Sequence, residues 1–270
     1  MRVIMIFAYF ILYVLASPAH AIYNPASGED DIIFIDDTQE VKMGHDLASH
    51  VDEKFGVLED VDMQLRVNDI GQRIVKVCDR QDLVYSFVVL EGKDLEEEFR
   101  HNAFALPGGY VYIFGEMVKD AQSDDELAAI LAHEVGHIVA RHSVKKLQSS
   151  IGLSGLGLIG MLSPSDSHTK KKASYAIGQL MMEYSREAEF EADKLSVRYL
   201  EAAGFDPRAA VNFVDRMLDK QISGKIYEYH YFRTHPYTTE RRAAMNKEID
   251  GRVSFDDYIN TPLGRSNAYW

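Results

Sequence analysis

The chain has 270 residues, with 29 Lys and Arg against 42 Asp and Glu, for a formal net charge of −13 at pH 7. Hydrophobic residues make up 46% and charged residues 26%, proportions that are typical of a globular protein and exclude wholesale disorder. The acidic balance disfavours binding to nucleic acid by bulk electrostatics, so we expect no nucleic-acid partner. Cys78 is the single cysteine, which excludes an internal disulfide, and we interpret it as a buried structural thiol.

The first 21 residues have the features of an export signal. Arg2 precedes an apolar run over 3–16, and Ala19-His20-Ala21 forms a small-x-small cleavage site. The run is shorter than the about 20 residues that a membrane-spanning helix needs. We therefore predict a signal peptide over 1–21 and an exported, periplasmic protein. Secretion, or tethering by an uncleaved segment, is the alternative.

Hydrophobic spacing divides the N-terminal half into short elements. Residues 22–40 mix acids with an apolar patch and are predicted to lead into a domain over 41–258, with a tail over 259–270. The spacing predicts helices over 41–55 and 61–77, followed by strands over 84–90, 99–106 and 110–114. The acidic run 91–98 is predicted to be a solvated loop.

Helical patterns fill the C-terminal half. They predict helices over 124–147, 173–203 and 207–219 and a short helix after Pro236. The segment 151–172, which is apolar and glycine-rich over 151–162, is predicted to be a mobile flap, hinge or loop near the site. Its GxGxxG match at 155–160 follows a helix rather than a strand, which argues against a dinucleotide site. The pattern as a whole indicates a mostly helical α+β fold with a small antiparallel sheet.

The motif HExxH lies inside the predicted helix 124–147, at His133, Glu134 and His137. Residues four apart share a helix face, so both imidazoles can reach one zinc ion at about 2.0 Å. Glu134 lies about 100° around the helix, from where its carboxylate can reach a metal-bound water as a general base. The alternative is two buried or surface histidines that bind no metal, which the motif alone does not exclude.

A catalytic zinc ion needs a third protein ligand. The extension HExxHxxGxxH is not present, because Ala140 and Ser143 replace its Gly and His, and His142 is one residue out of register. Glu189 and Asp193 are better candidates, since they are four apart on a predicted helix and share one face.

In this arrangement Glu189 ligates zinc and Asp193 accepts the free ring N–H of a ligand histidine. Glu187 and Glu191 then point to solvent. The alternative for all four acids is a charged, solvated helix face.

These motifs and several others, taken in order, resemble the M48 zinc metallopeptidases. The resemblance runs from about residue 32 to residue 250. It is carried by residues 41–44, 68–73, 102–110 and 133–137, by SRxxExxxD at 185–193, and by Thr234-His235-Pro236 with Arg241. It implies a zincin-like protease domain that holds one zinc ion per chain. The implied ligands are His133, His137 and Glu189, with Glu134 as the base and Asp193 as a proton donor or an outer partner of a ligand.

The resemblance also implies roles around the cleft. The segment Asn102, Ala103, Phe104 and Ala105 corresponds to an edge strand on which an extended peptide substrate lies as an added strand. His235 is implied as a transition-state donor or as a fourth ligand that closes the site, and its alternative is an ordinary turn residue. Arg241 either holds a buried carboxylate or forms a surface ion pair.

We therefore expect a zinc metalloendopeptidase that cleaves exported, misfolded or unassembled envelope proteins. It resembles the compact members of the family, without a C-terminal helical-repeat domain. The expected partners are protein or peptide substrates, with a peripheral contact to a membrane or to outer-membrane assembly machinery. The alternative function is a catalytically latent or silent zinc protein that acts as a chaperone or assembly factor. The oligomeric state is not predicted.

Overall fold

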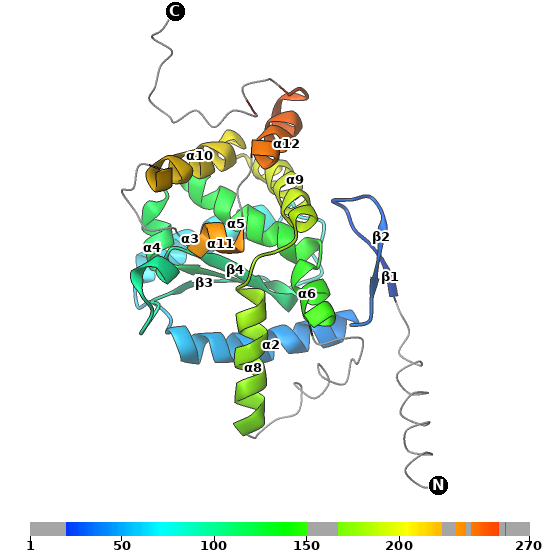
Figure 1. The fold of residues 1–270 in the computed structure, drawn as a ribbon, viewed down its shortest axis with the longest axis vertical. Helices are drawn as coiled ribbons and strands as arrows, with labels where there is room; N and C mark the ends of the chain where they lie inside the picture. The colour runs from blue at the N-terminus through cyan, green and yellow to red at the C-terminus, as the bar shows by residue number, and fades with distance from the viewer. Residues whose placement is uncertain (1–19, 151–166, 223–229, 236–238, 254–256, 258–270) are drawn as a thin grey trace, which may run out of the picture.

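The structure is a computed structural model that describes residues 20–150, 167–222, 230–235, 239–253 and 257 (Figure 1). Its elements in chain order are β1 (His20–Tyr23), β2 (Asp30–Ile33), α2 (Asp37–Phe55), α3 (Val61–Val75), β3 (Ser86–Leu90), η1 (Glu97–Arg100), β4 (Ala103–Leu106), η2 (Pro107–Gly109), β5 (Tyr110–Phe114), α4 (Gly115–Asp120), α5 (Asp124–Val139), α6 (His142–Ser150), α8 (Ser167–Leu180), α9 (Arg186–Ala203), α10 (Arg208–Ile222), α11 (His230–Thr234) and α12 (Thr239–Asp250). The mostly helical α+β class predicted from the sequence is confirmed.

The main sheet has the strand order β3-β5-β4, so β4 is an edge strand. β4 and β5 pair antiparallel through the tight turn η2, whereas β3 and β5 pair parallel. The sheet is therefore mixed rather than antiparallel, because the chain leaves β3, crosses to the far edge to form β4, and returns into the middle as β5. The strand predicted from residue 99 begins only at Ala103, since residues 97–100 form η1.

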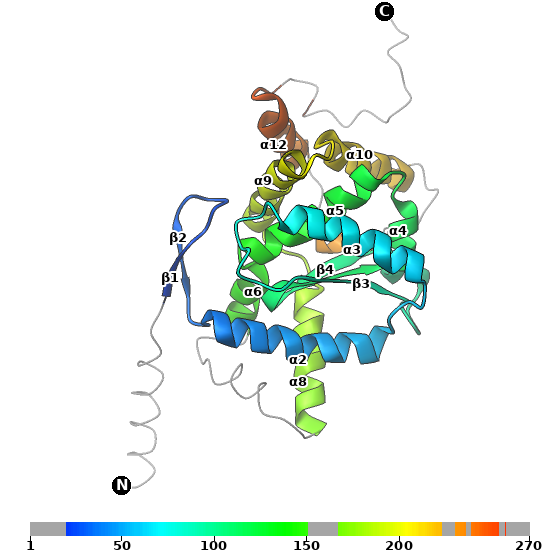
Figure 2. The ribbon, with the colours of Figure 1, turned by 180° about the vertical axis from the view of Figure 1, so that it is seen from behind.

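Successive side chains of the sheet point alternately into two hydrophobic clusters, as a pleated strand requires. Ala103, Ala105 and Val111 lie in the cluster shared with α3, α5 and α9. Phe104 and Tyr112 lie in the other cluster, with α2 and α8. The sheet is consequently covered on both faces, with α2 on one side and α3 and α5 on the other (Figures 1 and 2).

The predicted helix 124–147 is two helices, α5 and α6. Arg141, between them, has a φ of 54°, a left-handed conformation that an α-helix cannot contain. Its guanidinium pairs with the carboxylates of Glu40 and Asp37 on α2. Glu40 is 1% exposed and also accepts hydrogen bonds from Arg80 (2.9 Å) and from the backbone N–H of Gly108 (3.2 Å). This buried ion cluster offsets the strain of the break and fixes the direction of α6.

The boundaries of other helices differ from those predicted from the sequence, for reasons that lie in local hydrogen bonds. The predicted helix 173–203 is also two helices, because the Ser185 side chain accepts from the backbone N–H of Ala188 and caps a new start at α9. α2 begins at Asp37, four residues before the predicted start, since Asp36 and Gln39 form a capping box. The predicted helices at 207–219 and after Pro236 correspond to α10 and α12, whereas α4 and α11 were not predicted.

The segment 22–40 is not merely a lead-in, because it contains most of the hairpin β1–β2. The hairpin packs beside α6 and α9 (Figures 1 and 2). Lys145 of α6 donates to Asp31 (2.7 Å), and Lys194 of α9 donates to the carbonyl of Ala26 (2.8 Å). β1 begins at His20, inside the last residues of the predicted signal peptide, and the rest of that prediction lies outside the described residues.

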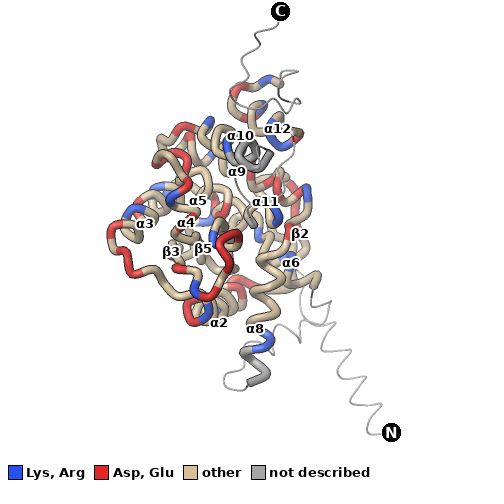
Figure 3. Tube along the Cα trace, turned by 60° about the vertical axis from the view of Figure 1, so that its left-hand side comes forward, with Lys and Arg blue, Asp and Glu red and all other residues tan. Residues whose placement is uncertain are grey.

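Of the predicted flap 151–172, residues 151–166 lie outside the described residues and 167–172 belong to α8; the predicted tail 259–270 also lies outside them. The acidic run between β3 and β4 lies at the surface with mostly exposed side chains (Figure 3). Cys78 is buried, as expected. No helix in the part of the chain that the structure describes has both the length and the apolar character needed to cross a membrane.

Candidate metal centre

The centre of the candidate site is the buried helix α5. His133, Glu134 and His137 are 4%, 0% and 0% exposed, respectively. The two imidazoles project from the same face, and their Nε2 atoms lie 3.1 Å apart. Because both ring nitrogens point at one spot, the helical spacing of the motif has produced a pair of donors that one ion can bridge.

α9 faces these histidines because Gly136, inside the motif, allows a close approach of the two helices. A Cβ atom at Gly136 would lie 2.9 Å from the carbonyl oxygen of Ala192. The close approach brings Glu189 to the pair: its Oε2 lies 3.4 Å from His133 Nε2 and its Oε1 lies 3.4 Å from His137 Nε2. Two imidazoles and a carboxylate therefore converge at one place between α5 and α9.

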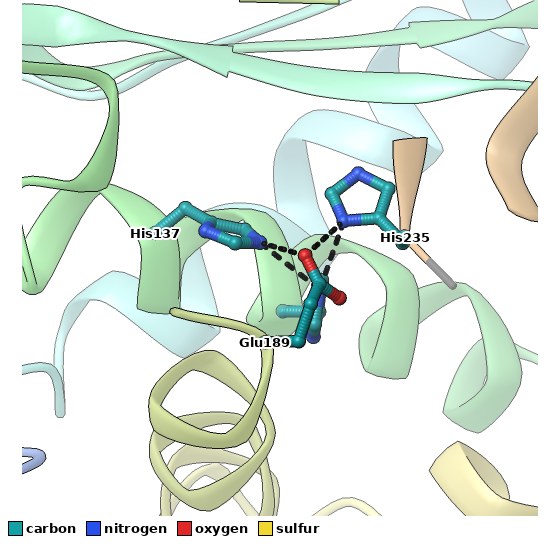
Figure 4. Close-up of side chains that lie close together, drawn as sticks. His137, Glu189 and His235 are labelled. Atoms are coloured by element: carbon teal, nitrogen blue, oxygen red, sulfur yellow. Dashed lines mark hydrogen bonds and ion pairs between the residues drawn. The ribbon is translucent and has the colours of Figure 1, made fainter. Parts of the chain in front are cut away.

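His235, which follows α11, is the fourth member of the cluster. Its Nδ1 lies 3.0 Å from Glu189 Oε1 and 3.3 Å from His133 Nε2, and the residue is 1% exposed (Figure 4). One ligand atom from each of His133, His137, Glu189 and His235 falls within 4.8 Å of the others. The side chain is thus a buried neighbour of the site and not an ordinary turn residue.

Asp193 and Arg241 lie behind the donor cluster. Asp193 Oδ1 is 3.1 Å from His133 Nδ1, the ring nitrogen that faces away from the cluster. Arg241 of α12 donates two hydrogen bonds to Asp193, at 2.7 and 2.8 Å, and its Nη1 lies 2.7 Å from Glu189 Oε2. Arg241 is 4% exposed, so of its two predicted alternatives the structure has the buried one.

The charges in the site are set by burial and by close partners. Burial lowers the pKa of His137 well below 6.5, so this imidazole is neutral. Burial acts to raise the pKa of Glu189, but His235 and Arg241 hold it well below its usual value. Burial also lowers the pKa of His133, but hydrogen bonds with Asp193 and Glu189 outweigh it and raise the pKa to about 9. A metal ion at this place would displace the His133 proton.

The residues fit a bound metal ion. Both carboxylate oxygens of Glu134 are buried without a hydrogen-bond partner among the described residues, and burial raises the pKa of this carboxyl. A buried carboxylate without a partner is costly unless something polar occupies the space in front of it. Nitrogen donors with one carboxylate suit a transition metal rather than calcium or magnesium. Glu134 lies beside that donor set, 3.4 Å from His235 Nε2, and is not part of it.

The predicted substrate strand lies beside this cluster, but its edge is covered. Ala105 accepts a hydrogen bond on its carbonyl from Ser143 of α6 (2.9 Å), and Thr234 of α11 donates to the side chain of Asn102 (3.3 Å). All four residues of β4 are buried. The role of Asn102, Ala103, Phe104 and Ala105 in holding a peptide stays a prediction.

Two neighbours of His137 were missed by the sequence reasoning. The Tyr184 ring stacks on His137, with centroids 4.1 Å apart. His142 Nδ1 lies 2.8 Å from His137 Nδ1, and His142 Nε2 lies 3.0 Å from Glu191 Oε2. The prediction that Glu191 points to solvent is wrong for this reason, whereas Glu187 is exposed as predicted. Helical spacing could not predict the contact between His142 and His137, because His142 turns towards His137 only through the break at Arg141.

Two histidines and a carboxylate that converge beside a buried glutamate are the donor set and the base that metal-dependent hydrolases use. Residues 62–249, more than half of the chain, match the family model of Peptidase family M48. The chain belongs to this family. The resemblance seen in the sequence is therefore confirmed.

Curated relatives have similar sequences over part of their length. The chain is 25% identical over 215 residues to the "Beta-barrel assembly-enhancing protease" of Escherichia coli (strain K12), covering 76% of this chain and 42% of that protein. It is 34% identical over 149 residues to the "Mitochondrial metalloendopeptidase OMA1" of Saccharomyces cerevisiae, covering 54% of this chain and 43% of that protein. The chain thus spans about two fifths of the length of these relatives.

Proposed function

We propose that this chain is a zinc-dependent metalloendopeptidase in which His133, His137 and Glu189 hold one zinc ion and Glu134 is the general base. The observation that carries the proposal is the convergence of both histidine Nε2 atoms and Glu189 next to the buried carboxylate of Glu134, which has no hydrogen-bond partner among the described residues. Membership in a peptidase family supports hydrolysis of peptide bonds. Zinc is proposed because it is the usual ion for such a donor set.

When bound, zinc polarises the scissile carbonyl and makes water more acidic. Glu134 takes the proton from the attacking water and passes it to the leaving amine. Burial raises the pKa of Glu134, which makes it a stronger base than an exposed carboxylate and a competent acid in the second transfer. Asp193 orients His133 by accepting from its Nδ1–H, and Arg241 neutralises the paired carboxylates.

We further propose that the substrates are misfolded or unassembled proteins of a bacterial envelope, reached after export to the periplasm. The charged, apolar and small-residue pattern of residues 1–21 supports export. The name of the relatives described as beta-barrel assembly-enhancing proteases supports an envelope client and a contact with assembly machinery.

The test is zinc content and casein cleavage of the purified protein. We expect about one zinc per chain, cleavage of unfolded casein, loss of cleavage on treatment with a strong chelator, and recovery on adding zinc back. Chelator-resistant cleavage, or a protein that binds no zinc, would contradict the proposal. The chelator alone, added after cleavage is complete, controls for effects on the gel or fluorescence readout.

A latent peptidase is the second candidate, and one observation favours it. His235 lies among the proposed ligands, and the segment that carries it also contacts the chain just before β4: the backbone N–H of Tyr231 in α11 donates to the carbonyl of His101 (3.3 Å). A histidine in this position, as a fourth ligand, would occupy the place of water and substrate until it is withdrawn.

Replacing His235 by Ala separates the roles proposed for it. If His235 keeps the site closed, the variant is expected to cleave casein faster than the unchanged protein while retaining one zinc. A fall in the rate with zinc retained would instead assign His235 to transition-state stabilisation. His45→Ala is the matched control, because the His45 side chain is 72% exposed on α2.

A further inference from the structure

The outward ring nitrogen of His137 has an unusual partner. His133 directs its Nδ1 at a carboxylate, that of Asp193, at 3.1 Å. His137 directs its Nδ1 at a second imidazole instead, that of His142, at 2.8 Å. His142 is 4% exposed, so water does not compete for this contact. The two proposed histidine ligands are therefore held by partners of different chemistry.

The proton positions in the hydrogen-bonded chain His137–His142–Glu191 can be assigned by starting from Glu191. A carboxylate only accepts hydrogen bonds, so at the 3.0 Å contact between His142 Nε2 and Glu191 Oε2 the imidazole donates. A neutral imidazole that carries its proton on Nε2 has a lone pair on Nδ1. His142 Nδ1 therefore accepts, His137 Nδ1–H donates, and the remaining lone pair of His137 lies on Nε2, which faces His133 and Glu189.

Glu191, the last residue of this hydrogen-bonded chain, contacts the N-terminal hairpin β1–β2. Asn24, in the turn between β1 and β2, is 2% exposed, and its side-chain amide donates to Glu191 Oε2 (2.8 Å) and to Asp31 Oδ2 (3.0 Å). Lys194 holds the same turn through the carbonyl of Ala26. The carboxylate that orients His142 is thus itself oriented by a residue more than 100 positions away in the chain.

We propose that His142 is a positioning residue for the metal centre: held by Glu191, and through it by Asn24 of the β1–β2 hairpin, it fixes His137 with Nε2 free to bind the ion. The inference rests on the proposed function in that it takes His137 Nε2 as a zinc ligand. It adds that the site is completed by the N-terminal hairpin, which lies outside the residues of the family match. Because the His142 ring lies between Glu191 and His137, the negative charge of Glu191 is one ring farther from a bound ion than the negative charge of Asp193.

The variants His142→Leu and His142→Asn test whether His142 positions His137 through a hydrogen bond. Leucine fills the buried space but cannot accept a hydrogen bond, whereas asparagine presents an oxygen close to the place of Nδ1. Competition with a chromophoric chelator should show zinc affinity about 10- to 100-fold weaker in His142→Leu, the usual effect of losing such a partner. His142→Asn should restore most of the affinity, and Asn24→Ala should give a smaller loss than His142→Leu. If Leu and Asn bind zinc alike, a packing role explains His142 and the proposal is overturned.

A spectroscopic measurement decides the same question without any variant. In protein with ¹⁵N-labelled histidine, the ring shifts should identify His142 as the Nε2–H tautomer and show a coupling across the hydrogen bond to His137 Nδ1. A His142 ring protonated on Nδ1 would overturn the proposal. The spectrum is informative with or without metal, so a protein that binds no zinc would contradict the proposed function while the inference is still judged by the tautomer.

Discussion

Replacing Glu134 by Gln is expected to lower the rate of casein cleavage by a factor of about 10² to 10⁴, the usual contribution of a positioned general base. Glutamine has almost the same shape but cannot take a proton from water. Glu134 is not a member of the cluster of possible ligand atoms, so the variant should still bind one zinc per chain. Its folded state should be at least as stable, because a neutral amide is easier to bury than a carboxylate that has no hydrogen-bond partner in the part of the chain that the structure describes.

The measurement is the initial rate of cleavage of fluorescently labelled casein, with zinc content determined on the same preparation. Glu201→Gln is the matched control, since it makes the same chemical change at an exposed position on the last turn of α9. Undiminished cleavage by the Glu134 variant would remove the base from the mechanism. A loss of both cleavage and zinc would show that Glu134 belongs to the metal-binding set.

Replacing Arg241 by Met is expected to destabilise the fold by about 3–5 kcal/mol, the range measured when one partner of a buried ion pair is removed. Arg241 makes two hydrogen bonds to Asp193 and lies 2.7 Å from Glu189, and all three side chains are buried. Methionine fills the space of the arginine stem but leaves both carboxylates without their shared cation. The free energy of unfolding, from urea denaturation followed by circular dichroism, measures the effect.

Arg186→Met provides the comparison for Arg241. Arg186 is also paired with a glutamate, Glu240, but both side chains are exposed and their charges are 3.8 Å apart. An exposed pair contributes about 0–1 kcal/mol, so this variant should unfold close to the unchanged protein. Saturating zinc should recover part of the stability of the Arg241 variant, because a bound cation compensates Glu189. Equal stability of the two variants would mean that Arg241 is not needed to balance the buried acids.

The parts of the site that follow helical spacing could be predicted from the sequence. His133, Glu134 and His137 lie on one helix, and Glu189 and Asp193 lie on another, so their faces follow from intervals of one and four residues. Capping signals such as Ser123 likewise placed the start of α5, where the side chain accepts from the backbone of Glu126.

What could not be predicted depends on tertiary contacts. The break at Arg141 is stabilised by Glu40, which lies 101 positions earlier in the chain. A local sequence pattern cannot predict a contact between residues so far apart. Without the break, His142 would have pointed away from His137. The mixed sheet was missed for a similar reason, since alternation within a strand does not specify the direction of its neighbour.

Gly136 has a consequence for which ions the site can accept. The missing side chain lets the backbones of α5 and α9 approach closely, so the distance between the helices that carry the histidines and Glu189 is set by main chain against main chain. The two helices cannot move closer together, and the space that remains for an ion between their side chains is small. The centre should therefore discriminate by ionic radius, favouring small ions with short bonds and tolerating large cations poorly.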